Sequence, residues 1–153
     1  MRKHFLAILL LVATLGLTLS VGTTTANAKR HHYTTVPTSL RGHWYHYNSR
    51  RHKYDQVKAT KYHFYTKSAT SSHWYKLSGK KFPRYAYGHS ELGVKKYHGN
   101  YIVGKYATDG GPLWKKMTRH HHASLRASRP ATMEDEGAPT KYYFKTKALA
   151  KQF

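Results

Sequence analysis

Cysteine is absent from the 153-residue sequence, so the chain has no disulfide bonds and no thiol ligands for a metal. Acidic residues are also scarce, with 6 Asp and Glu against 27 Lys and Arg and a formal net charge of +21. Phosphate-binding loops, dinucleotide-binding glycine motifs and the Gly-x-Ser-x-Gly motif of hydrolases do not occur either. These absences argue against the common nucleotide-dependent enzymes and against a small domain held together by disulfides.

Long hydrophobic runs are confined to the N-terminal segment. Residues 2–4 are basic, residues 5–21 are predominantly apolar, and residues 26–28 (ANA) have the small-x-small pattern of a cleavage site. We therefore expect residues 1–28 to be a cleaved signal peptide and the protein to be secreted, extracellular or cell-wall associated. No later run approaches the roughly 20 apolar residues that span a bilayer as a helix, so no transmembrane span is expected after cleavage.

Cleavage removes Arg2 and Lys3 and leaves 125 residues with 25 basic and 6 acidic side chains, a formal charge of +19. Leu, Ile, Val and Phe make up only 15 of these residues, a composition that on its own is typical of disorder. However, 21 residues are aromatic, and each buried aromatic side chain removes roughly 150–250 Å² from water. We therefore expect a basic N-terminal arm at residues 29–35 and a single small domain with an aromatic core at residues 36–153.

Aromatic and cationic residues alternate with a period of two, which places successive side chains on opposite faces of a strand. Residues 61–67 and 141–147 show this pattern most clearly. Their expected inward side chains are Tyr62, Phe64, Tyr142, Phe144 and Thr146. Turn-prone residues separate further candidate strands at 43–47, 72–77, 82–87, 101–106 and 113–118, and a helical pattern occurs only at 147–153. The sequence therefore predicts an all-β fold, either a small antiparallel β-barrel or a sandwich.

The alternation lapses between residues 118 and 140, a stretch that also holds half of the acidic residues. We expect a long mobile loop here, partly disordered, before the last strand. The stretch begins with His120, His121 and His122, but consecutive residues of a strand alternate between its faces. Because no neighbouring Cys or Asp completes a tetrahedral ligand set, no metal site is expected.

Residues 37–45, with the sequence PTSLRGHWY, resemble the Pro-x-x-Leu-Arg-Gly-x-Trp-Tyr opening of small secreted proteins of Gram-positive lactic-acid bacteria. Within this opening, Gly42 and Trp44 resemble the Gly-x-Trp signature on the first strand of lipocalins and related calycin barrels. The resemblance implies a lipocalin-like barrel in which the tryptophan packs across one end, and it favours a barrel over a sandwich. In that family an arginine of the last strand often packs on this tryptophan, whereas the last strand here offers Lys141, Lys145 and Lys147.

The net charge is the strongest functional signal, because cations spread along the whole chain attract polyanions over most of the surface. We expect an exported, non-enzymatic protein that associates electrostatically with anionic cell-wall and envelope polymers such as teichoic acids. Incidental binding of extracellular DNA or anionic lipid headgroups follows from the same charge. Because the twelve histidines after the signal segment gain charge in acid, association should tighten as the pH falls through about 6.5. The lysines expected to bind are Lys61, Lys67, Lys80, Lys81, Lys95, Lys96, Lys115, Lys116, Lys141, Lys145 and Lys147.

The alternative is a lipocalin-like carrier that holds a small apolar ligand inside its barrel. Its expected interior residues are Trp44, Tyr62, Phe64 and Phe144. An enzyme is not expected, because Asp55, Glu91 and Asp109 are isolated in the sequence and form no acid–base pair. The sequence therefore predicts neither catalytic residues nor a cofactor.

Overall fold

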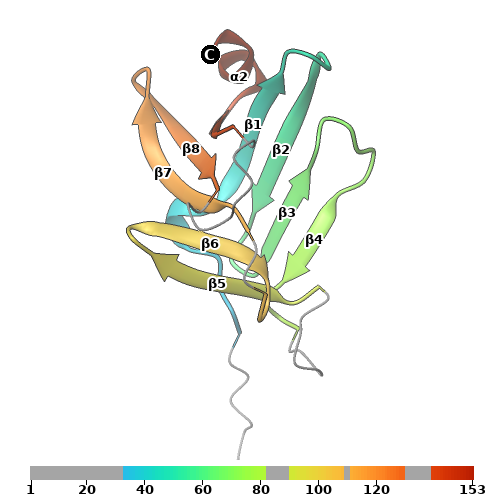
Figure 1. Ribbon diagram of the computed structural model, residues 1–153, viewed down its shortest axis with the longest axis vertical. Coiled ribbons are helices and arrows are strands. Elements are labelled where there is room, and N and C mark those ends of the chain that lie inside the picture. Colours follow the sequence, from blue (N-terminus) through green and yellow to red (C-terminus); the bar gives the residue numbers. More distant parts are fainter. Residues whose placement is uncertain (1–32, 82–89, 109–110, 130–138) are drawn as a thin grey trace, which may run out of the picture. The chain divides into compact units, whose positions relative to one another are not determined.

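The computed structural model describes residues 33–81, 90–108, 111–129 and 139–153 (Figure 1). The chain divides into two units, Met1–His31 and His32–Phe153, and every described residue belongs to the second unit. The expected signal segment and the expected strand at 82–87 lie outside the described residues. None of the described helices is long and apolar enough to cross a membrane.

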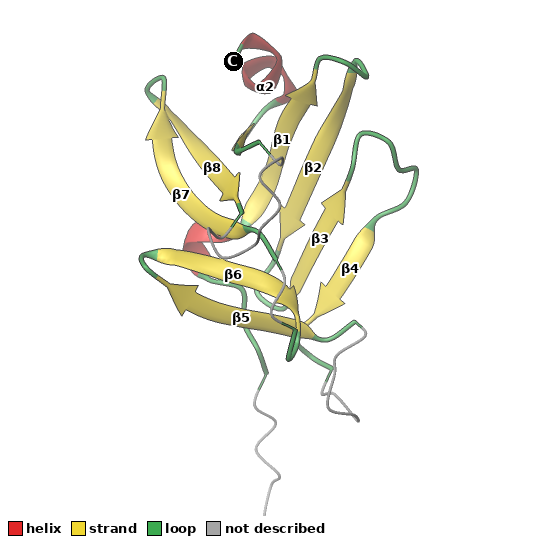
Figure 2. Ribbon diagram, in the orientation of Figure 1, coloured by secondary structure: helices red, strands yellow, loops and turns green. Residues whose placement is uncertain are grey.

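Within these ranges nine strands dominate, and Figure 2 shows how little of the unit is helical. The strands are β1 (Gly42–Asn48), β2 (Lys53–Ala59), β3 (His63–Lys67), β4 (Tyr75–Ser78), β5 (Leu92–Tyr97), β6 (Asn100–Lys105), β7 (Leu113–Arg119), β8 (His122–Ser128) and β9 (Lys141–Phe144). A 3₁₀ turn, η1 (Thr38–Leu40), precedes β1, and a short helix, α2 (Lys147–Gln152), follows β9. The strand order β4-β3-β2-β1-β9-β8-β7-β6-β5 curls into a nearly closed barrel, so the expectation of a small all-β barrel is confirmed.

The barrel closes at two junctions, one of which joins strands that are distant in sequence. β1 pairs antiparallel with β9, with Tyr45 opposite Phe144. Since the strands of a meander alternate in direction and their number here is odd, one junction of the ring must be parallel. That junction lies between β4 and β5, where Ser78 and Glu91 form a single parallel bridge and the Ser78 N–H donates to the Ser90 carbonyl at 2.8 Å.

Alternate residues of each strand point into the barrel and form its core. Trp44 of β1 lies opposite Val57 of β2, and Phe64 of β3 lies opposite Leu77 of β4. All four side chains are buried, and the same core contains Trp114 and Tyr143. Fully burying a side chain of this kind contributes roughly 1.5–3 kcal/mol, and aromatic rings bury the most area, so a chain with few aliphatic residues still assembles a core.

The expectation of a loop throughout residues 118–140 is wrong, because residues 122–128 form β8. β7 and β8 are joined by a two-residue hairpin turn whose two residues, His120 and His121, have φ values of 48° and 61°. Two consecutive positive φ angles define the type I′ turn, which normally carries Asn-Gly. Histidine enters this conformation more readily than most residues, so the turn forms without the usual sequence signal.

The period-two pattern also fails to predict β2 and β5, and the structure shows the reason. In β2 an inward position is occupied by Asp55, only 4% exposed, where an apolar residue would complete the alternation. In β5 the apolar residues are limited to Leu92 and Val94, and two exposed lysines follow them directly. Both strands are defined by pairing with their neighbours, β2 with β1 and β3 and β5 with β6, rather than by their own hydrophobic pattern.

β9 has the opposite phase to the predicted one. Tyr143, expected to point outward, lies in the barrel core, and its neighbour Phe144 shares the outer face with Tyr45 of β1. Phe144 is nevertheless buried, because the C-terminal segment covers it, with the Phe153 ring 5.6 Å away between centroids. Both faces of this strand are therefore apolar, which is why alternation alone assigned them in the wrong order.

The expected C-terminal helix is confirmed as α2, but Thr146 is not an inward strand residue. β9 ends at Phe144, and the Thr146 hydroxyl accepts a hydrogen bond from the Leu149 N–H at 3.3 Å. Thr146 is thus the N-cap of α2, a position where threonine satisfies a backbone donor that has no partner within the helix. Ala150 on the buried side of α2 faces the barrel.

Candidate functional site

A cavity of about 640 Å³ lies within the barrel, between the β2–β4 side and the β6–β9 side. This volume is in the range of roughly 300–1,000 Å³ that small-molecule pockets occupy. Four residues were expected to line a ligand site, and of these Phe64 alone lines this cavity, where it forms part of the apolar wall. Other apolar side chains of the wall include Leu77, Val103, Trp114, Ala127 and Tyr143.

Three aromatic rings meet in the cavity wall. Trp114 contacts Phe64 edge-on, with ring centroids 5.3 Å apart, and contacts Tyr143 at 5.8 Å. The Trp114 Nε1–H is buried and donates to no acceptor among the described residues. Burial raises the pKa of the Tyr143 hydroxyl far above its ordinary value, with a smaller effect from the Asp55 carboxylate, so this hydroxyl remains protonated. The wall therefore offers apolar surface together with polar groups that do not ionise.

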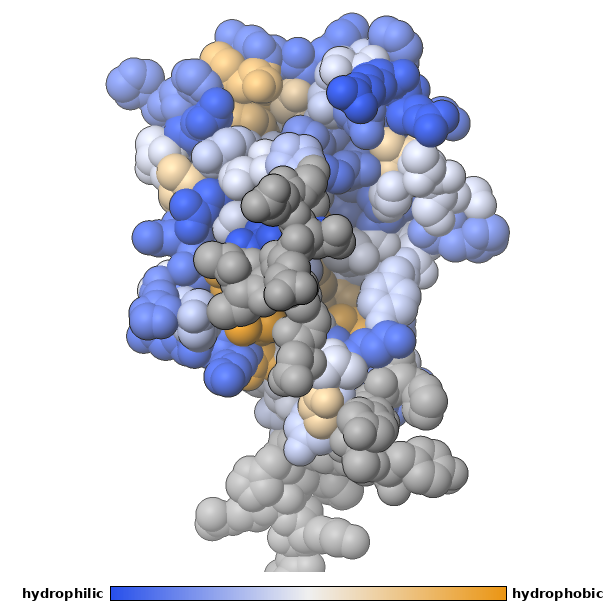
Figure 3. All heavy atoms as spheres, viewed as in Figure 1, coloured by the Kyte–Doolittle hydropathy of each residue, from blue (hydrophilic) through white to orange (hydrophobic). Residues whose placement is uncertain are grey.

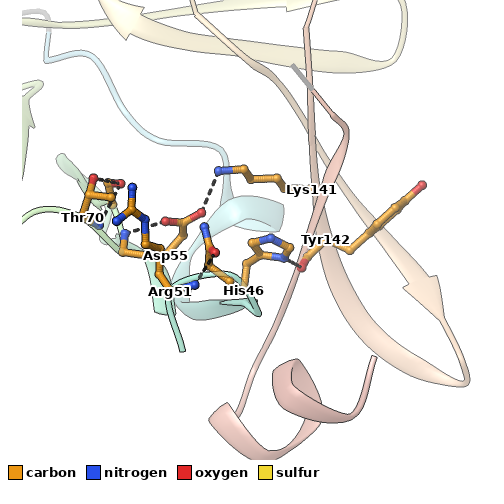
Figure 4. Close-up of polar contacts among 9 residues, drawn as sticks. His46, Arg51, Asp55, Thr70, Lys141 and Tyr142 are labelled. Carbon is orange, nitrogen blue, oxygen red and sulfur yellow. Dashed lines mark hydrogen bonds and ion pairs between the residues drawn. The ribbon is translucent and has the colours of Figure 1, made fainter. Parts of the chain in front are cut away.

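A charged pair lies beside this wall, as Figure 4 shows. The buried Asp55 carboxylate accepts a hydrogen bond from the Lys141 ammonium at 2.7 Å and another from the Ala69 N–H at 2.6 Å. Lys67 and Lys105 line the cavity as well, whereas Asp55 is the only acidic residue that lines it in the described part of the chain. Because Lys141 already neutralises Asp55, the remaining cations give the cavity a preference for an anionic group.

His46 lies next to Asp55 and completes the polar cluster in Figure 4. Its Nδ1 is 3.0 Å from the Tyr142 carbonyl oxygen, which can only accept, so Nδ1 carries the proton and the neutral ring is held in one tautomer. Burial lowers the pKa of His46, and the hydrogen bond and Asp55 offset this only in part. A neutral His46 is thus part of the folded structure.

Trp44, expected to line a ligand site, belongs to the buried core and does not line this cavity. Its ring is fully buried, and its Nε1–H donates to the Leu40 carbonyl at 2.9 Å. The Lys145 ammonium lies 3.4 Å from the ring centroid and donates to the Arg41 carbonyl at 3.3 Å. A lysine of the segment after β9 therefore packs on the Trp44 ring and binds it by cation–π attraction.

Gly42 makes room for this lysine. Its φ of +125° belongs to the region that favours glycine, and a Cβ added there would collide with Lys145 Nζ. The Gly-x-Trp pair identified in the sequence thus acts as one packing unit with Lys145.

Tyr62 and Phe144 do not line the cavity either. Phe144 lies beneath the C-terminal segment, outside the barrel wall. Tyr62 precedes β3, so the strand alternation does not apply to it, and its half-buried ring contacts Tyr33 at 5.5 Å. The ammonium groups of Lys61 and Lys80 lie 5.1 and 5.3 Å from the centre of the Tyr62 ring.

Nine of the eleven lysines expected to bind polyanions are exposed, and they are distributed over several elements rather than gathered in one cluster. The other two, Lys67 and Lys141, are half-buried and line the cavity. In Figure 3 hydrophilic side chains dominate the visible surface of the described residues.

The sequence pattern placed Leu77, Val103 and Trp114 in expected strands as apolar residues. It did not predict that these three side chains line one cavity.

The described residues contain no group of three His, Asp or Glu placed to hold a metal. His120 instead stacks on Phe153, with ring centroids 4.2 Å apart and planes inclined by 10°. No protein-family model, curated protein sequence or solved structure matches this chain. The function therefore has to be argued from the barrel, its cavity and its surface.

Proposed function

We propose that the protein is an exported, non-enzymatic binding protein that associates electrostatically with anionic cell-envelope polymers such as teichoic acids. The supporting observation is that nine of its expected binding lysines are exposed, while the described residues include only two acidic side chains, Asp55 and Glu91. Asp55 is buried and paired with Lys141, so it subtracts little from the external positive potential. A surface of this kind attracts polyanions from any direction.

The chemistry of the surface favours diffuse contact with phosphates. Lysine ammonium groups are compact point charges, whereas arginine is the residue suited to bidentate recognition of one phosphate. Contacts of this type release counterions from the polymer, so the affinity should fall steeply as salt rises. No single lysine is expected to dominate.

Co-sedimentation with purified cell walls, with and without teichoic acid, across a salt series tests the proposal. We expect retention that requires teichoic acid and decreases with salt. Replacing Lys95, Lys96, Lys115 and Lys116 by Gln should weaken the salt dependence of binding. The slope of log K against log salt concentration should become shallower by up to roughly 0.9 for each phosphate that is no longer neutralised. The matched control replaces the same four lysines by Arg and should retain binding. Retention that ignores both salt and teichoic acid would exclude the proposal.

Acidification should strengthen this association, but not through every histidine. Burial lowers the pKa of His46, and burial with the nearby Lys76 and Lys80 lowers the pKa of His63. These two imidazoles remain neutral further into the acid range than an ordinary histidine, so they contribute less to the gain in positive charge on acidification.

The cavity supports a second candidate function, the binding of a small amphiphile with an anionic group. Its apolar wall suits a hydrocarbon chain, and Lys67 and Lys105 provide cationic contacts. Titration with a fluorescent fatty acid and with the corresponding alcohol tests this function. We expect saturable binding of the acid, weaker binding of the alcohol, and loss of both in Val103→Trp, whose larger ring fills the cavity. Binding that Val103→Trp leaves unchanged would place the ligand elsewhere.

A further inference from the structure

The outer surface of β1 to β3, with the residue that precedes β4, carries a continuous strip of aromatic rings that the barrel core does not use. In order of contact the strip consists of Tyr47, Tyr54, Tyr45, His43, Trp74 and Tyr65, and this set is called the outer aromatic strip. Consecutive centroids lie 5.2, 6.3, 4.4, 5.9 and 6.4 Å apart. Four neighbouring strands span about 14 Å at roughly 4.8 Å per strand, so the strip is long enough for more than one sugar ring.

The strand register explains why these rings share one face. Tyr45 and Tyr47 alternate with the inward-pointing Trp44 and His46, and Tyr47 lies opposite Tyr54 of β2. His43 lies opposite Lys58, which in turn lies opposite Tyr65 of β3. Because the inner faces of the same strands already supply the core, these rings are not needed to fill the barrel.

The strip remains open to solvent. Trp74 is 38% exposed, and Tyr45, Tyr47, Tyr54 and Tyr65 are half-buried. The inward-pointing Trp44, Val57 and Phe64 of the same strands are almost completely buried. A contiguous aromatic patch on a protein surface is a common mark of a binding site, whereas scattered single rings are not. The outer aromatic strip meets this description.

Cations line the strip and no described acidic side chain does. The Lys147 ammonium lies 5.9 Å from the Tyr45 ring and 5.5 Å from the Tyr54 ring, and the Lys76 ammonium lies 5.7 Å from Tyr65. Asp55 points into the barrel, and Glu91 belongs to the junction between β4 and β5. The strip is therefore complementary to an anionic ligand that also carries rings.

The ring geometry favours sugars over nucleic-acid bases. Tyr45 and Tyr54 are inclined by 84°, and Tyr65 and Trp74 by 87°, so successive rings do not form a ladder of parallel faces. Stacking of consecutive bases depends on such open faces. Two polar tips of the strip are held in place by hydrogen bonds, Tyr45 Oη to His43 Nδ1 at 3.1 Å and His43 Nε2 to Gln56 at 3.2 Å. Such tips can bond to sugar hydroxyls.

We infer that the outer aromatic strip is a binding surface for a phosphodiester polymer that carries sugar substituents. The sugars pack on the aromatic rings while Lys76 and Lys147 contact the phosphates. The inference rests on the proposed function and adds to it, because the remaining exposed lysines provide affinity for the charged backbone and the strip provides selectivity for its sugars.

The test compares two polymers with the same backbone, glycosylated wall teichoic acid and its deglycosylated form, by equilibrium titration of the protein without its signal segment. Wild type should bind the glycosylated polymer about tenfold more tightly, a ratio of the size expected for a pair of aromatic contacts. Trp74→Ala combined with Tyr65→Ser should remove this preference and leave the affinity for the deglycosylated polymer within about twofold. Tyr97→Ser combined with Tyr106→Ser, which replaces exposed rings outside the strip, should change neither affinity.

The outcomes separate this inference from the proposed function. Equal affinity of wild type for the two polymers would overturn the inference and leave the electrostatic proposal intact. Absence of binding to both polymers would overturn both. Tighter binding of a single-stranded oligothymidine than of the glycosylated polymer, abolished in the Trp74 and Tyr65 variant, would assign the strip to nucleic acid instead. If near-ultraviolet circular dichroism shows that this variant is unfolded, Trp74→Leu alone, which keeps an apolar side chain but removes the ring, provides the same comparison.

Discussion

Asp55 is the residue that most clearly departs from the chemistry of the rest of the chain. It is a buried carboxylate in a strongly cationic protein, and it joins β2 to Lys141 of β9 and to the backbone of Ala69. Removing one member of a buried pair leaves the other groups without a partner, so the two ends of this contact need not be equally important. Lys141 is 39% exposed and can regain water, whereas the Ala69 N–H is buried with Asp55.

We expect Lys141→Met to lower the free energy of unfolding by about 3 kcal/mol, because it leaves the buried Asp55 carboxylate without its cation. Asp55→Ala should cost about 2 kcal/mol, because the buried Ala69 N–H loses its acceptor while the exposed Lys141 regains water. Urea denaturation of both variants and of the double variant measures the effect. A Lys141→Met variant as stable as wild type would show that the buried carboxylate does not need its cation.

His46 makes the stability of the fold depend on pH. Its pKa is lowered in the folded state, so below pH 6.5 the unfolded chain binds a proton that the folded protein does not. The stabilisation is complete above pH 6.5 and decreases as the pH falls through that value toward the folded pKa. We expect His46→Gln, which keeps a donor for the Tyr142 carbonyl, to lose less stability between pH 7.5 and pH 5 than wild type does.

His63 provides the comparison for this prediction, because its pKa is lowered too. Urea midpoints of the two single variants and of His46→Gln with His63→Gln, measured from pH 5 to 7.5, should show the smallest pH dependence in the double variant. A His46→Gln protein with the pH dependence of wild type would show that His46 is charged in the folded state at pH 5.

At the scale of the elements, two hairpins of the barrel use the same turn with different residues. The β5–β6 turn contains His98 and Gly99, and the β7–β8 turn contains His120 and His121. The second position of a type I′ turn favours glycine, because a Cβ is strained at positive φ. The two hairpins can therefore be compared directly, because the second turn position holds the favoured glycine, Gly99, in one and His121 in the other.

We expect His121→Gly to raise the free energy of unfolding by about 1 kcal/mol and Gly99→Ala to lower it by about the same amount. His121 is exposed, and a Cβ at Gly99 meets no atom within 4 Å, so both changes report backbone strain rather than altered packing. Thermal or urea unfolding of the two variants measures this. A stabilising effect of Gly99→Ala would exclude the strained backbone at that turn.

The same elements show what the sequence alone could and could not predict. Alternation predicted the all-β class, as a barrel or a sandwich, and the strands with apolar inward residues, as in β1 and β7. It missed β2, where Asp55 takes an inward position, and it missed β8, whose turn carries His120 and His121. It reversed β9 because the C-terminal segment covers Phe144. The cavity was beyond sequence reasoning, since its walls meet only when β9 pairs with β1.

At the scale of the whole molecule, the excess of positive charge opposes compaction. Like charges repel one another over the Debye length, which is about 10 Å at 0.1 M salt, and the described residues offer few carboxylates to offset them. Added salt should therefore stabilise the fold while it weakens the association with anionic polymers. The two properties respond to the same charges in opposite directions.

We expect the urea midpoint to rise when sodium chloride is increased from about 10 to about 300 mM, with the m-value unchanged because the buried area does not change. The variant in which Lys95, Lys96, Lys115 and Lys116 are replaced by Gln should show a smaller rise and a higher midpoint at low salt. A midpoint that falls with salt would mean that attractive pairs such as Asp55–Lys141 contribute more to stability than the repulsion among the cations.

The way the ring closes also bears on how fast the chain folds. All pairings within β1–β4 and within β5–β9 join strands that are consecutive in sequence, so each half can form from hairpins between neighbours. The remaining ladder pairing, Tyr45 with Phe144, joins residues that are almost a hundred positions apart. Contacts between such distant residues carry the largest entropic cost in folding. We therefore expect the arrival of β9 beside β1 to set the folding rate, with the C-terminal α2 completing that step rather than preceding it.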